Sequence, residues 1–327
     1  MAVTSPRQRA LSFLSLTAIV VAVLGLYGVV LVGGMSPLSR YLGGAPVGLE
    51  TALSGDEVTS AGRLDEAFAR MGYRLEKVAS GHEVPPVFLA AVPGDLAQLP
   101  VVDTKKRVFL RVMLPLVLVV NESVAADRRR LDAIARKRAT GQYVTYDESE
   151  WLASVAARYG AEGASAADLL KRVDVVPASL ALAQAAEESG WGTSRFTLEA
   201  NNLFGHYAAT GGDGLVAAGD SSRRLAQFAS LYEAVAAYVH NLNTHRAYEP
   251  LRRLRAAVRA RGAFPDGHTL AGALTAYSER GQAYVDGIRA LIRKNSLLRF
   301  DHARLGTGRG RAATLPRQTV AMAEQTP

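Results

Sequence analysis

Two adjacent carboxylates, Glu187 and Glu188, lie at the end of an otherwise apolar stretch that begins at Pro177. The leucines and alanines of this stretch predict a buried helix, because they leave little polar surface to face water. Neighbouring residues point about 100° apart on a helix, so the two glutamates cannot share a role. Glu188 lies four residues after Gln184 and three before Trp191. These three residues would share one face if the helix continued as far as the tryptophan.

The surroundings expected for Glu188 suit a general acid. A carboxyl group beside an indole at the end of an apolar helix is poorly solvated, and burial disfavours the charged form of a carboxyl group. A carboxyl group that keeps its proton in this way can protonate a leaving group. The alternative is an ordinary glutamate exposed at a helix end, and spacing by itself does not decide between the two.

The residues around Glu188 resemble the signature of the bacterial glucosaminidase family, glycoside hydrolase family 73. AQAAEESGWG followed by ANNLFG is similar to the family pattern A-Q-A-x-x-E-S-x-W-G and N-N-L-F-G. The stretches KKRVFLRVMLP, AYVHNLNTHRAYEPLR and YSERGQAYVDGIRALIRKNSL resemble the Bax-like branch of that family. The resemblance covers roughly residues 105–298.

The resemblance implies a mainly α fold: a lysozyme-like helical domain with a small β-lobe, and a groove for a glycan strand between the lobes. It implies hydrolysis of a β-1,4 bond next to N-acetylglucosamine in peptidoglycan, with Glu188 as the catalytic acid. A tyrosine of the last helical pair reaches the active site in the wider family, and the aligned residue is Tyr284. Its phenol could orient a water or bond the acetamido group, or it could pack in the core. Tyr277 is expected to be structural.

Four residues are candidate substrate contacts: Gln184, Trp191, Asn202 and Phe204. Trp191 could support Glu188 from the core and also form a wall of the groove. Asn202 could contact a sugar or tie its own loop, since asparagine tolerates a left-handed backbone. Phe204 could pack in the core instead of binding.

The second catalytic group is harder to identify. Cleaving a glycosidic bond needs a group that stabilises the oxocarbenium-like state or activates water. Bax-like relatives usually carry a second glutamate a few residues before a phenylalanine, and the position that matches it before Phe228 falls on or near Arg223-Arg224. Asp213 and Asp220 are the carboxylates of the predicted β-lobe, and Asp213 is our candidate. Otherwise the acetamido group of the substrate could assist, or the enzyme could be slow or inactive. Glu122 could also approach the groove, or contact solvent or a neighbouring loop.

Composition excludes several classes of function. The chain has 327 residues, a formal net charge of +8, 49% hydrophobic residues and no cysteine. Disulfide and thiolate chemistry are therefore excluded, and the basic balance fits an anionic cell wall or lipid surface. No nucleic-acid-binding signature is present, so no nucleic-acid partner is expected. No metal-ligand motif is present and His240 and His245 do not form a ligand set, so no metal or cofactor is expected. The five arginines between Pro250 and Gly262 predict a solvated helix face.

The chain divides into five expected segments: a cytoplasmic N-terminus (1–10), a transmembrane anchor (11–34), a tether and proline-rich strap (35–104), the catalytic domain (105–300) and a disordered tail (301–327). The uncharged run in the second segment is long enough to cross a hydrocarbon layer of about 30 Å. Arginines precede it, which places the rest of the chain in the periplasm. A cleaved signal peptide is the alternative.

Patterning predicts a short amphipathic helix over 61–78, using Leu64 and Phe68. Within the domain it predicts helices over 103–138, 147–159, 165–172 and from 232 onward, a loop or hairpin over 206–219 and a strand over 224–228. The apolar run MLPLVLVV is too short to span a membrane, so we expect a core helix there. The sequence thus predicts a single-pass inner-membrane peptidoglycan hydrolase that acts on glycan strands. The alternatives are a non-catalytic peptidoglycan-binding scaffold with a degenerate site, or a lytic transglycosylase.

Overall fold

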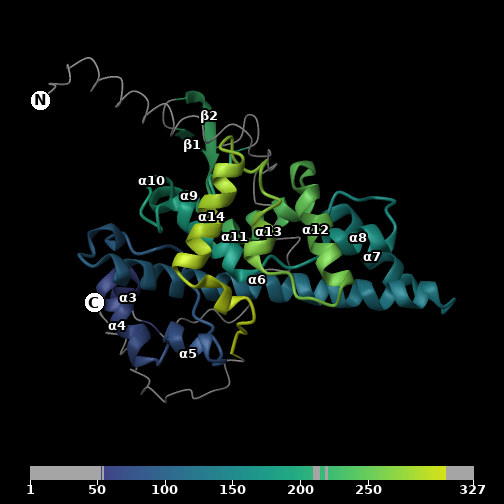
Figure 1. Cartoon of the computed structure of the whole chain (residues 1–327), viewed down its shortest axis with the longest axis horizontal. Coiled ribbons are helices and arrows are strands. Elements are labelled where there is room, and N and C mark those ends of the chain that lie inside the picture. Colours follow the sequence, from purple (N-terminus) through teal and green to yellow (C-terminus); the bar gives the residue numbers. More distant parts are fainter. Residues whose placement is uncertain (1–52, 54, 209–213, 218–219, 307–327) are drawn as a thin grey trace, which may run out of the picture.

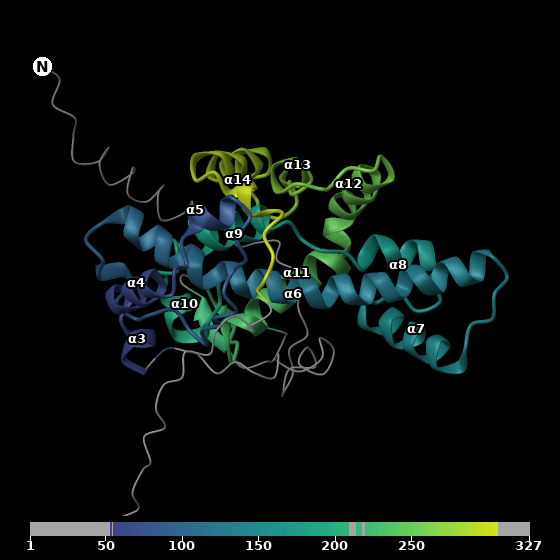
Figure 2. The ribbon, with the colours of Figure 1, turned by 90° about the horizontal axis from the view of Figure 1, so that it is seen from below.

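A single long helix organises the protein. The computed structural model describes residues 53, 55–208, 214–217 and 220–306. Helix α6 (Val102–Ala139) runs for 38 residues along the molecule. Helices α3 to α5 gather near one end of it and α7 and α8 near the other, as both views show (Figures 1 and 2). The predicted anchor, residues 11–34, lies outside the described residues.

The other elements are short. Before α6 come α3 (Gly55–Thr59), α4 (Ala61–Arg70), α5 (Leu75–Ala79) and the 3-10 helix η1 (Leu96–Gln98). After α6 come α7 (Tyr146–Arg158), α8 (Ala166–Arg172), α9 (Ala178–Ser189) and α10 (Arg195–Ala200). Beyond a hairpin follow α11 (Leu231–Thr244), η2 (Arg246–Tyr248), α12 (Glu249–Ala260), α13 (Gly267–Ala271), α14 (Gln282–Lys294) and η3 (Leu297–Phe300). The described chain is therefore mainly helical.

Helix α6 is a core helix, as its sequence predicts. Every residue from Val108 to Leu118 is buried. Length and composition alone would let α6 cross a membrane, but 72% of its most apolar window is buried inside the protein. Burial of this apolar surface stabilises the fold by roughly 25 cal/mol per Å².

Helix α9 lies inside the domain, between α6, α13, α14 and η3. All its residues from Ala178 to Ala186 are buried. Because its N-terminus carries no cap of its own, the carboxylate of Asp301 accepts hydrogen bonds from the backbone N–H (2.7 Å) and the hydroxyl (2.8 Å) of Ser179. Gly267 packs so closely that a Cβ there would lie 2.1 Å from the Ser179 hydroxyl oxygen.

A hairpin of two antiparallel strands, β1 (Gly214–Ala217) and β2 (Asp220–Ala226), forms the small β-lobe. Leu215 pairs with Leu225, and the register shifts between Val216 and Ala217. Leu225 also pairs with Tyr207, which joins the hairpin to the segment after α10. The strand predicted over 224–228 begins earlier than expected, at Asp220.

The helix predicted over 61–78 is present as two short helices, α4 and α5, and Leu64 and Phe68 are fully buried in the common core. Helix α3 lies within the segment expected to be a tether. The strap that follows is held by backbone hydrogen bonds, from Leu231 to the carbonyl of Ala90 (2.9 Å) and from Val84 to the carbonyl of Arg304 (2.8 Å). The chain is described as far as residue 306, six residues into the predicted tail.

The solvated arginine face predicted for the α12 region is wrong for two of its five arginines, while Arg253 and Arg261 are exposed as expected. Arg252 and Arg255 are 4% and 0% exposed. Both donate to backbone carbonyls at the ends of neighbouring segments, Arg252 to His245 (2.8 Å) and Arg255 to Val175 (3.0 Å). Such carbonyls lack partners inside their own helices or turns, and a guanidinium supplies several donors at once. The prediction was wrong because composition counts charges without showing which carbonyls they reach.

Asp174 balances these buried charges. It is 1% exposed, and both its oxygens accept from Arg259, at 2.6 and 2.7 Å. Its carboxylate also lies 3.5 Å from Arg128 and from Arg255. This network joins α6 and α12 to the segment that leads into α9.

Replacing this carboxylate by its amide, Asp174→Asn, should destabilise the protein by about 3–5 kcal/mol, because it leaves buried guanidinium groups without a counter-charge. Urea unfolding measures the change. Glu249→Gln is the control, since Glu249 pairs with Arg253 at the surface, and it should leave the unfolding midpoint unchanged. An Asp174→Asn protein that unfolds at the wild-type urea concentration would show that the network does not stabilise the fold.

Candidate active site

Glu188 lies in the last turn of α9, where the buried helix reaches the surface. The helix ends at Gly190, whose φ of 58° is left-handed. Trp191 is also left-handed, with a φ of 61°, and its N–H donates to the carbonyl of Ala186 (2.9 Å). The helix therefore does not continue to Trp191, so the condition for a face shared with Glu188 is not met. A tight turn places the indole instead.

The turn is anchored in the core. The N–H of Gly192 donates to the hydroxyl of Ser189 (2.8 Å). A Cβ on Gly192 would lie 2.9 Å from the Phe109 ring and 3.1 Å from Leu96, so only glycine fits there without a shift. The indole of Trp191 meets the Phe109 ring edge-on, with 5.8 Å between centroids. Trp191 is thus partly buried and partly exposed, in keeping with both roles expected of it.

A chain of three hydrogen bonds leads from the core to Glu188. The hydroxyl of Tyr238 donates to Oε1 of Gln184 (2.7 Å). Nε2 of Gln184 donates to the hydroxyl of Tyr284 (2.9 Å), and that hydroxyl donates to Oε1 of Glu188 (2.8 Å). The structure therefore brings together three of the residues singled out from sequence, Gln184, Glu188 and Tyr284.

The role expected for Gln184 needs correction. Its side chain is fully buried and both ends of its amide are engaged with tyrosines, so it cannot also contact a glycan. Because an amide has distinct donor and acceptor ends, Gln184 directs the hydroxyl proton of Tyr284 toward Glu188. Gln184 is a positioning residue.

Aromatic rings enclose this chain. Tyr284 stacks on Tyr277 with 5.3 Å between ring centroids, and Tyr238 stacks on Phe204 at 4.0 Å. Burial, and to a smaller extent the charge of Glu188, raises the pKa of Tyr238 well above its usual value, and the same causes raise the pKa of Tyr248. Both phenols therefore stay protonated at neutral pH. Tyr284 packs in the core, as one alternative expected, and its hydroxyl also reaches Glu188.

Asn202 and Phe204 do not line a groove. Asn202 is 2% exposed; its Nδ2 donates to the carbonyls of His206 and Ala226 (both 2.8 Å), and its Oδ1 accepts from the N–H of His206 (3.0 Å). Phe204 is fully buried. The sugar contacts expected of these two residues are wrong, because the turn after α10 points them inward to hold the hairpin.

The second catalytic group is not identified among the described side chains. Asp213 lies outside the described residues, and of Asp220 only the backbone is described, in β2. Arg224 is exposed and donates to the carbonyl of Gly214 (3.0 Å). Glu187 is occupied by Arg280, at 2.8 Å.

Glu122 lies elsewhere. Burial raises its pKa, and a backbone hydrogen bond from Leu305 partly opposes that rise. The side chain of its neighbour Asn121 binds the backbone of Val176, just before α9. Its Nδ2 donates to the carbonyl of Val176 (2.7 Å), and its Oδ1 accepts from the N–H of Val176 (3.1 Å). Glu188 is at the other end of that helix, about 16 Å away at ~1.5 Å per residue. Glu122 therefore contacts a neighbouring loop, and the alternative of a second carboxylate in the groove is wrong.

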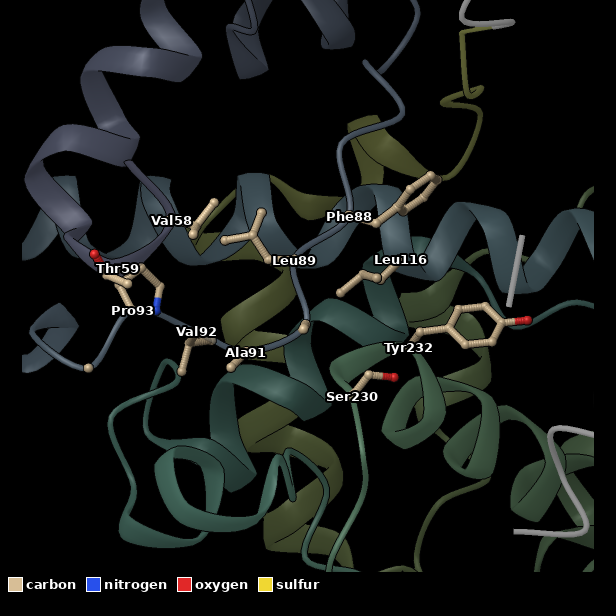
Figure 3. A pocket seen from close by; sticks show the side chains of 12 residues that line it. Val58, Thr59, Phe88, Leu89, Ala91, Val92, Pro93, Leu116, Ser230 and Tyr232 are labelled. Atoms are coloured by element: carbon tan, nitrogen blue, oxygen red, sulfur yellow. The ribbon is translucent and has the colours of Figure 1, made fainter. Parts of the chain in front are cut away.

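A separate apolar pocket of about 570 Å³ lies between the strap and the start of α11 (Figure 3). Phe88, Leu89, Val92, Leu116 and Tyr232 are among its lining residues. Neither Glu188 nor any residue of the hydrogen-bonded chain lines it, so it does not belong to this site. Within the part of the chain that the structure describes, no three His, Cys, Asp or Glu side chains are grouped to hold a metal ion.

Comparison with known proteins now identifies the family. The family model described as mannosyl-glycoprotein endo-beta-N-acetylglucosaminidase (Glucosaminidase) matches residues 163–297. Protein bax of Escherichia coli (strain K12) is 33% identical over 214 residues, which is 64% of this chain and 76% of that protein. The chain belongs to the Bax-like glucosaminidase-domain family. No solved structure matches it.

The matched glucosaminidase region contains α9, the hairpin and α14, and so the whole hydrogen-bonded chain. Sequence reasoning missed Tyr238, because its partner Gln184 is 54 residues away and α11 is apolar enough to explain a tyrosine as core. It also gave no role to Lys106, whose ammonium lies 5.0 Å above the centre of the Trp191 ring. No local pattern distinguishes Lys106 from the lysine beside it.

His206, in the turn that Asn202 holds, makes stability depend on pH. Burial lowers its pKa from 6.5 to about 4, so the unfolded chain binds the proton more tightly. The free energy of unfolding should therefore fall by about 3 kcal/mol as pH drops through this window. Burial lowers the pKa of His240 similarly, to about 4, so His206→Leu should remove about half of the combined loss. Urea titrations at several pH values measure it; His82→Leu, at an exposed histidine, is the control. An unchanged slope in His206→Leu would contradict the assignment.

Proposed function

We propose that this protein hydrolyses the β-1,4 glycosidic bond at N-acetylglucosamine in peptidoglycan, with Glu188 as general acid. The observation that carries the proposal is the contact between Glu188 and Tyr284, at the end of a buried helix inside a glucosaminidase-family domain. A carboxyl group held in one orientation beside an exposed surface can deliver a proton to a leaving oxygen.

The hydrogen-bond directions assign the atoms. The hydroxyl of Tyr284 donates to Oε1 of Glu188, so the proton that Glu188 delivers sits on Oε2. Oε2 passes this proton to the glycosidic oxygen as the bond from that oxygen to the anomeric carbon breaks. Water then adds to that carbon, and its surplus proton returns to Glu188 or leaves to solvent. Asp213 remains our candidate for activating this water, with the substrate acetamido group as the alternative.

The proposal extends to location and substrate contacts. Residues 11–34 would anchor the chain in the inner membrane, with the domain in the periplasm beside its glycan substrate. Trp191, which is partly exposed next to Glu188, would form a wall of the groove. The N-terminal sequence supports the membrane anchor. Helix α6 does not, because its apolar residues are buried in the core.

Removing the acid tests the proposal. Glu188→Gln should lower the rate of wall digestion by about 10²–10⁴-fold, because the amide cannot deliver a proton. Glu187→Gln is the matched control, one residue away and paired with Arg280, and it should keep most activity. Release of soluble muropeptides from purified sacculi measures both. Digestion by Glu188→Gln at the wild-type rate would refute the proposed role of Glu188.

The products separate the alternatives. New reducing ends of N-acetylglucosamine support hydrolysis, and anhydro-muramyl ends indicate a lytic transglycosylase, which needs one acid/base and no water nucleophile. Intact sacculi that still retain the wild-type protein indicate a binding scaffold. The described residues supply one placed carboxylate, Glu188, so this comparison matters for the mechanism.

The hydrogen-bonded chain gives a second test. Tyr284→Phe removes the donor to Glu188, and Gln184→Leu removes the group that directs that donor. Each should lower kcat with little change in KM, because both side chains are buried, with Gln184 0% and Tyr284 1% exposed. Since Gln184 acts through Tyr284, the double variant should be no slower than the slower single variant. Losses that multiply would show that the two residues act independently.

A further inference from the structure

A lysine ammonium lies over the indole of Trp191, three residues after Glu188 in the chain. Lys106, in the first turns of α6, has its Nζ 5.0 Å from the centre of the Trp191 ring. The face of an indole attracts a cation, which holds the ammonium there. Among the described residues, no hydrogen bond or ion pair of Lys106 accompanies this ring contact. By contrast, the Nζ of the adjacent Lys105 donates to the carbonyl of Ala97 (3.0 Å).

The position of Lys106 relative to Glu188 is fixed by the turn between them. The N–H of Trp191 is bonded to the last turns of α9, and its ring rests on Phe109, one helical turn beyond Lys106 on α6. Both Lys106 and Trp191 are partly exposed, so their outer surfaces are open to a ligand. On the other side, Glu187 is already neutralised by Arg280. Lys106 therefore presents a positive charge over the indole of a residue that lies three positions after the proposed acid.

We infer that Lys106 binds a carboxylate of the substrate and thereby selects muramic acid glycans over neutral ones. The inference rests on the proposed peptidoglycan hydrolase activity and names the chemical group of the substrate, a carboxylate, that the site recognises. A carboxylate would form a charge-assisted hydrogen bond with the ammonium while the sugar packs against the exposed part of Trp191. Two parts of the glycan carry this chemistry. They are the lactyl group, where no peptide is attached, and the free carboxylates of the stem peptide.

A purely structural role for Lys106 predicts a different pattern of binding. If the ammonium only packs against the indole, its removal disturbs Trp191 and weakens every glycan alike. If it reads a carboxylate, its removal weakens anionic glycans and leaves neutral ones unaffected. Comparing glycans of different charge therefore tests the inference directly.

The experiment measures binding in the Glu188→Gln background, so that no strand is cut during the measurement. The full chain, in detergent, is titrated with chitin oligosaccharides, with peptide-free muramyl glycan strands and with peptide-bearing strands. Lys106→Gln should weaken binding to at least one of the two anionic glycans by about three- to tenfold, and the loss should shrink at high salt. Binding to chitin should not change. Lys106→Arg should keep the affinity, and Lys105→Gln is the matched control with no expected effect.

The three glycans distinguish the sources of the carboxylate. A loss confined to peptide-free strands assigns the lactyl carboxylate, and a loss confined to peptide-bearing strands assigns the peptide. Equal losses on all three glycans, or no loss on any, would overturn the inference. If the wild-type protein binds anionic strands through Lys106 but cuts none, the proposed hydrolase activity is overturned and the inference about Lys106 stands.

Discussion

A buried amide in an otherwise apolar helix is the constraint on which the site depends. Gln184 is fully enclosed, and an amide in such a place is costly unless both of its ends are hydrogen-bonded. Tyr238 from α11 and Tyr284 from α14 meet this need from two sides. Satisfying the amide therefore fixes how these two helices pack on α9. It also leaves one phenol aimed at Glu188, so a requirement of folding positions a group for chemistry.

The fold could be predicted where its signals are local. The buried stretches that became α6 and α9 are visible in the sequence because apolar residues dominate them, and a short hairpin follows from the glycines after α10. The arginines of α12 could not be assigned in the same way. The role of Arg255 depends on Asp174 and on the carbonyl of Val175, 80 residues away, and no spacing on one helix reveals such partners.

The candidate site also could be predicted only where its signals are local in the sequence. Glu188 stands out because its motif is contiguous, and Tyr284 was singled out through the family resemblance. The inward orientation of Asn202 and Phe204 was one of two alternatives that the sequence left open, and the turn after α10 decides between them. Sequence left open whether α9 would continue to Trp191, and the left-handed turn at Gly190 ends the helix first. Local motifs therefore indicated which residues matter more reliably than which way they point.

The cap on α9 bears on how the chain can be made. Asp301, which binds the N-terminal end of this helix, is 122 residues downstream of Ser179, and the segment just beyond it hydrogen-bonds to Val84. During synthesis, α9 emerges long before the carboxylate that completes its first turn. A nascent chain must therefore carry an apolar helix without its N-terminal hydrogen-bond partner until nearly the whole domain has been synthesised. Release of an incomplete chain would expose that helix, and with it a surface prone to aggregate.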